Sequence, residues 1–117
     1  MSAQPDGPHG PLIPMPELTP DALRAAVAKI APSRLPGLTK HLFEATTNAQ
    51  QLQSLAPLRT FVHSWAVFVA IERHPQRAAR LRELETAAEE AADRDAIRPI
   101  LAEIRGILDA AEAEAGL

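Results

Sequence analysis

Residues 56–75, APLRTFVHSWAVFVAIERHP, decide the fold class of this 117-residue chain. They include the single tryptophan, Trp65, and two of the three phenylalanines, Phe61 and Phe68. At helical spacing these three rings share one broad face. In the second half of the stretch the opposite face is apolar too, and a helix that is apolar all round is covered on both sides. The pattern therefore predicts a central helix over about residues 57–73.

An acid and a proline mark the end of this helix. Pro75 disfavours the helical conformation in the residue before it, so a break is predicted there. Glu72 falls on the aromatic side, where a carboxylate must be paired or reach water. We expect Glu72 to pair with Arg73, Arg77 or Arg80 and to fix the angle between two helices. The residues with a predicted structural role are Phe61, Trp65, Phe68, Glu72 and Pro75.

Four further helices are predicted around the central one. They cover about residues 20–31, 33–53, 75–93 and 95–115. Thr19 can cap the first of them, with Pro20 at its first position. The last two form either separate helices or one bent rod, because Pro99 permits a kink or a late start. With no alternating strand pattern in the sequence, the fold class is all-α: a small bundle of four to five helices, with residues 19–117 as a single helical domain.

Residues 1–18 are predicted to be a flexible, extended, proline-rich arm. Pro5, Pro8, Pro11 and Pro14 fall at every third position. Polyproline II has three residues per turn, so these rings would line one edge of that conformation. Such an arm either docks into an aromatic groove of a partner or is a plain stiff leader, and we favour the leader.

The composition indicates a thin core. Hydrophobic residues make up 46% of the chain, but 23 of them are alanine. Alanine favours helix and buries little surface. A chain of this size is already marginal in stability, so extra burial in a dimer or a complex is expected.

Several classes of protein are disfavoured by residue usage. The net charge of −3 argues against a nucleic-acid coat, since phosphate binding needs excess Lys and Arg. The absence of cysteine excludes disulfides, thiolate zinc sites and cysteine nucleophiles. No apolar run is long enough for a membrane span, and no signal peptide is evident. The expected location is cytoplasmic.

No residue pattern indicates a catalytic, cofactor or metal site. His41 and Glu44 have a spacing that metal ligands use on helices, but two ligands are weak evidence. His63 and Ser64 are neighbours on a helix and therefore diverge. Phosphate-binding glycine motifs are absent from the sequence. We therefore predict that the protein is not an enzyme and has no cofactor.

The C-terminal third is acidic and amphipathic. Residues 83–117 carry ten acids against three arginines, a net charge of −7. Four apolar residues of the last helix recur at heptad-like spacing, and two arginines precede the acidic region. The predicted partner-binding residues are Ile97, Leu101, Ile104, Leu108, Arg77 and Arg80.

Two stretches carry a family resemblance. They are residues 9–36, HGPLIPMPELTPDALRAAVAKIAPSRLP, and residues 56–85, whose core W-A-x-x-V-x-I-E-R-x-P spans Trp65 to Pro75. The chain resembles an uncharacterised family of short actinobacterial helical proteins, often encoded near RelE/ParE-type toxin genes. The resemblance covers about half of the chain and carries no catalytic residues. It implies an antitoxin-like role, in which a helical protein covers a small basic toxin.

The leading hypothesis is therefore a non-catalytic protein-binding module. Its partner would be a small basic toxin or, in the alternative, a second copy of the chain. A homo-oligomeric structural or regulatory protein would use the apolar seam of the last helix for self-contact. A DNA-linked regulator ranks third, because the acids that follow the arginine cluster would repel phosphate.

Overall fold

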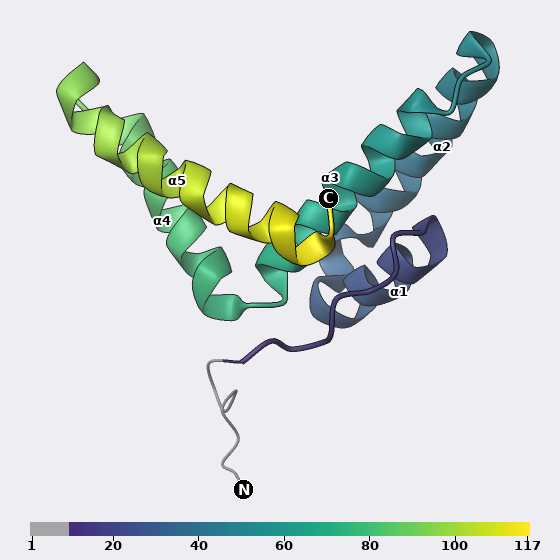
Figure 1. Cartoon of the computed structure of the whole chain (residues 1–117), viewed down its shortest axis with the longest axis horizontal. Coiled ribbons are helices and arrows are strands. Elements are labelled where there is room, and N and C mark those ends of the chain that lie inside the picture. Colours follow the sequence, from purple (N-terminus) through teal and green to yellow (C-terminus); the bar gives the residue numbers. More distant parts are fainter. Residues whose placement is uncertain (1–9) are drawn as a thin grey trace, which may run out of the picture.

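The computed structural model describes residues 10–117 and contains five α-helices and one 3₁₀ turn within them (Figure 1). The elements are α1 (Pro20–Ile30), η2 (Pro32–Arg34), α2 (Leu35–Leu52), α3 (Ala56–Glu72), α4 (Pro75–Glu90) and α5 (Arg94–Ala115). No strand occurs in the described part of the chain. The all-α prediction is confirmed, and α4 and α5 are separate helices.

Side-chain caps explain two of the helix starts. Thr19 Oγ1 accepts a hydrogen bond from the Ala22 amide at 3.2 Å, as the sequence predicted for α1. Asp93 does the same for α5, accepting from the Ala96 amide at 2.8 Å. Pro99 lies inside α5 and does not delay its start. The cap at Asp93 thus answers the question that the sequence left open about α4 and α5.

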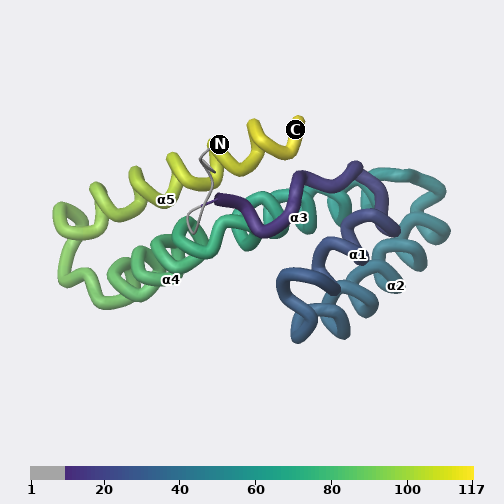
Figure 2. The backbone as a smooth tube through the Cα atoms, turned by 90° about the horizontal axis from the view of Figure 1, so that it is seen from below, coloured from purple at the N-terminus to yellow at the C-terminus, as the bar shows by residue number. Residues whose placement is uncertain are grey.

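The helices form a V rather than a rounded bundle (Figure 1). One arm consists of α2 and α3, with α1 lying against them, and the other consists of α4 and α5 side by side, as Figure 2 also shows. We call the second arm the C-terminal hairpin. The radius of gyration is 16.4 Å, whereas a compact domain of this size would have about 13 Å. Much of each arm is therefore only two helices thick.

The core runs along α3 and reaches both arms. Phe61, Trp65 and Val69 of α3 pack with Leu23 of α1 and Leu38 of α2. A second cluster at the vertex of the V joins the two arms, and it consists of Ala70, Ile71, Ala78 and Ala111. α3 packs against each of the other α-helices, which confirms it as the central helix.

Residues 10–18 lie against the vertex without forming a helix. The Leu12 amide donates to the Arg73 carbonyl at 2.7 Å, and Arg73 Nη1 donates to the Ile13 carbonyl at 3.3 Å. The Ile13 and Met15 side chains pack on the core. The rest of the predicted arm, residues 1–9, lies outside the described residues, and so do its first two prolines.

Candidate binding surface

The aromatic side chains of α3 form a closed structural cluster with His41. Trp65 Nε1 donates to His41 Nδ1 at 3.0 Å, and the Phe61 and His41 rings meet edge to face at 5.0 Å. Phe68 packs against Trp65 at 5.2 Å, and the Arg34 guanidinium lies 4.8 Å from the Phe68 ring. His41, which the sequence raised as a metal-ligand candidate, is thus occupied as the hydrogen-bond acceptor of the tryptophan.

Glu72 pairs across the α3–α4 turn, but with a different arginine from those expected. Its carboxylate lies 3.5 Å from Arg82 Nη1. The expectation of Arg73, Arg77 or Arg80 as the partner is corrected, because those three arginines turn toward carboxylates of α5. Proline at the first position of α4 agrees with the predicted break. The nearby arginines in the sequence therefore indicated that Glu72 would be paired, and the direction of each arginine side chain decided that its partner is Arg82.

Glu114 is the polar centre of the vertex. Its carboxylate accepts hydrogen bonds from Arg77 at 2.5 Å and from Arg73 at 2.8 Å, and His74 Nε2 lies 3.3 Å away. The hydrogen bond from Arg77 is the main reason that the pKa of Glu114 falls to about 2, although partial burial opposes the shift. A single carboxylate thereby ties the end of α3 and the start of α4 to the end of α5.

A second ion pair joins α4 to α5 within the C-terminal hairpin. Arg80 donates from Nε and Nη2 to the two carboxylate oxygens of Glu103 at 2.7 and 2.8 Å, and Nη1 donates to Glu83 at 3.1 Å. These hydrogen bonds raise the pKa of Arg80 and lower that of Glu103. Arg77 and Arg80, which were predicted to bind a partner, are thus already engaged by α5. Their contacts span 37 and 23 residues, and no local pattern in the sequence signals them.

One apolar stripe of α5 is covered at its C-terminal end and open toward its N-terminal end. We call it the α5 stripe, and it consists of Ile97, Leu101, Ile104, Leu108, Ala111 and Ala115. Ala111 is fully buried, Ala115 is 6% exposed, and Leu108 packs against the vertex cluster. Leu101, two turns closer to the tip of the hairpin, is 49% exposed. The four predicted apolar contacts thus continue the core along α5: Leu108 packs on it, Ile97 and Ile104 are half-buried, and Leu101 is exposed.

The tip of the C-terminal hairpin has no core of its own. Beyond Leu84 on α4, and before Ala111 on α5, no side chain in the hairpin is fully buried. Ile97 and Ile104 are half-buried there. Because apolar burial supplies the main favourable free energy of folding, this half of the hairpin is only weakly stabilised by the rest of the chain.

The wall that faces the α5 stripe across the V is polar. At its base, His63 Nε2 of α3 lies 3.3 Å from Glu112 of α5. Arg59 follows one turn further from the vertex on the same face of α3, and it is exposed. The α3 side of the V therefore carries the positive charge of Arg59, and the α5 side carries the exposed Leu101.

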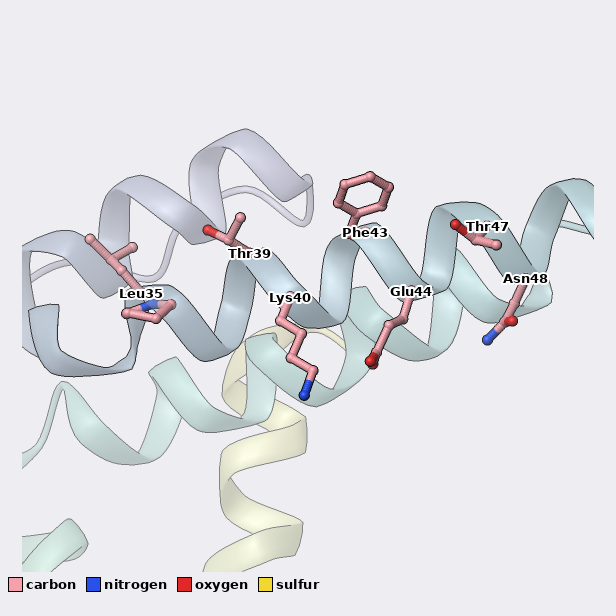
Figure 3. A pocket seen from close by; sticks show the side chains of 8 residues that line it. Leu35, Thr39, Lys40, Phe43, Glu44, Thr47 and Asn48 are labelled. Atoms are coloured by element: carbon pink, nitrogen blue, oxygen red, sulfur yellow. The ribbon is translucent and has the colours of Figure 1, made fainter.

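A wide hollow lies elsewhere on the surface, on the outer face of α2 (Figure 3). Its lining residues all belong to the segment from Leu35 to Asn48. Phe43 points away from α3 and is 73% exposed. Small-molecule sites bury most of the ligand between several elements. A single helix offers only one wall, so this hollow is an open surface.

Among residues 10–117, no group of three or more His, Cys, Asp or Glu side chains is placed to hold a metal ion. No helix in the same part of the chain is both long and apolar enough to cross a membrane. Comparison with protein-family models, with curated proteins and with solved structures finds no match for this chain.

Proposed function

We propose that this protein is a non-catalytic protein-binding module whose contact surface is the open part of the α5 stripe. The observation that carries the proposal is the continuity of the stripe with the core: buried at Ala111, it emerges at Leu101, which is 49% exposed. Leu101 is exposed between the half-buried Ile97 and Ile104, and apolar surface that continues a core in this way is typical of interaction sites. A partner would supply the layer that the two-helix hairpin lacks.

A small basic protein is the first candidate partner, in keeping with the antitoxin-like role that the family resemblance implies. Residues 83–117 have a net charge of −7, and Glu85, Glu89 and Glu90 of α4 are exposed. Such a surface attracts a basic protein and raises its association rate. A cytoplasmic setting, which we also propose, is compatible with the lack of cysteine.

The arginine cluster gives little support to the alternative of a DNA-linked regulator. Arg73 and Arg77 contact Glu114, Arg80 contacts Glu103, and Arg82 contacts Glu72. Arginines that are neutralised within the protein contribute less to phosphate binding than free ones.

Co-expression with the product of the neighbouring gene tests the proposal. The wild-type chain should relieve the toxicity of a basic neighbouring protein and co-purify with it in a fixed ratio. Leu101→Asp should abolish both effects, because it buries a charge in the contact. Leu52→Asp is the matched control: Leu52 is 68% exposed at the far tip of α2 and lies outside the stripe.

Circular dichroism separates loss of binding from loss of fold, and both variants should keep wild-type helicity because both leucines are exposed. Retention of the complex by Leu101→Asp would contradict the proposal. The alternative function, a homo-oligomeric structural or regulatory protein, uses the same stripe and is favoured by the order of charges on α5.

A further inference from the structure

Five charged residues follow one flank of α5 beside the α5 stripe. The opposite flank faces α4, since Glu103 and Glu114 contact arginines there. From the N-terminal to the C-terminal end, the flank away from α4 carries Arg94, Arg98, Arg105, Asp109 and Glu112, of which Glu112 also lies 3.3 Å from His63 of α3. The basic residues thus occupy the open end of the hairpin, and the acidic ones lie close to the vertex.

We infer that a second copy of this chain covers the α5 stripe, with the two α5 helices antiparallel about a two-fold axis. The inference rests on the proposed function and names the occupant of that surface. In an antiparallel pair of helices, the same flank of each helix faces its counterpart in reverse order. Basic residues of one copy then meet acidic residues of the other, twice over, as an isologous contact requires.

The charged and apolar residues agree on one alignment. When Arg98 lies opposite Asp109 of the second copy, Arg94 comes within one residue of Glu112 of that copy. The same alignment brings Leu101 within about one helical turn of Ile104 across the axis. Arg105 lies near the axis, within about one helical turn of Arg105 of the second copy. Asp109 of its own helix, 3.9 Å from its Nη1, offsets that repulsion.

The charges also decide between a second copy and a basic protein as the occupant of the stripe. Arg94, Arg98 and Arg105 border the open part of the stripe, and Arg59 lies on the facing wall. A basic partner would find no opposite charge at this wall and would have to place its own charges against the exposed acids of α4. The hairpin of a second copy is acidic over residues 83–117 and would bring carboxylates to this wall. The exposed acids of α4 remain outside the contact, free for a basic protein.

Sedimentation equilibrium with charge-reversal variants tests the inference. The wild-type chain should dimerise at micromolar concentration. Arg98→Glu and Asp109→Arg should each weaken the dimer about tenfold, because two-fold symmetry turns two attractive contacts into repulsive ones. The double variant should recover most of the wild-type affinity, and an equal mixture of the two single variants should associate better than either alone.

Arg24→Glu on α1 is the matched control, since it makes the same charge change on an exposed residue outside the proposed contact and should leave the dimer unchanged. A strictly monomeric wild-type chain, or a dimer that ignores both reversals, would overturn the inference. A monomer that still forms a complex sensitive to Leu101→Asp with another protein would overturn this inference alone and leave the proposed function standing.

Discussion

The indole N–H of Trp65 donates to the Nδ1 atom of His41 across the contact between α2 and α3. The bond lies in a partly buried setting, and it requires that Nδ1 of the imidazole carry no proton. Because a buried donor without an acceptor costs more than the bond itself contributes, this contact constrains the side chain at residue 41.

His41→Leu should therefore lower the free energy of unfolding by about 1–2 kcal/mol. In the background of Trp65→Phe, which removes the donor, the same change at residue 41 should cost about 1 kcal/mol less. Urea unfolding of the two single variants and of the double variant measures this difference. Strict additivity of the two changes would show that the hydrogen bond contributes nothing to stability.

Glu114→Gln should destabilise the protein by about 1–3 kcal/mol at neutral pH, because it removes the charge that Arg73 and Arg77 share. The pKa of Glu114 falls from 4.5 to about 2 on folding. Its stabilisation is therefore complete above pH 4.5 and is lost as the pH falls toward 2. The gap between wild type and variant should narrow over that range in urea titrations. Glu89→Gln on the exposed face of α4 should show no such gap.

At the scale of the elements, Gly106 inside α5 and Gly116 at its C-cap should respond in opposite ways when replaced by alanine. Gly106 lies within the helix, and a Cβ atom there would meet nothing within 4 Å, so Gly106→Ala should stabilise the protein by about 0.5–1 kcal/mol. Gly116 caps the helix at φ +81°, so Gly116→Ala should destabilise it by about 1 kcal/mol. Thermal unfolding measures both, and equal responses would contradict this account of the cap.

The elements that could be predicted from the sequence are those with local causes. Thr19 begins α1 through its own side chain, and Pro75 separates α3 from α4 through its own ring. The contacts of His41 and Glu114 could not be predicted, because their partners are distant along the chain and are chosen by helix orientation. The apolar character of the α5 stripe is local and could be predicted. Its division into covered and open parts depends on the angle of the V and could not.

At the scale of the whole molecule, the V separates regions of different stability. α3 has six buried residues and contacts every other α-helix, whereas the hairpin tip between Leu84 and Ala111 has no buried residue. Regions with few buried apolar contacts open most easily. The tip should therefore fluctuate toward open states more often than α3, and a covering partner would suppress those openings.

Hydrogen exchange should follow this division. Amides of α3 between Phe61 and Ile71 should be the slowest to exchange, and those of α5 between Ile97 and Ile104 should be much faster in the dilute wild-type chain. Raising the protein concentration should slow exchange in this part of α5 and leave α3 nearly unchanged, because a ligand protects the segment that it covers. In the Arg98→Glu variant the same slowing should require about tenfold higher protein concentration. Uniform protection along α3 and α5 in the monomer would mean that the tip is stable without a partner, and the physical reason for expecting one would disappear.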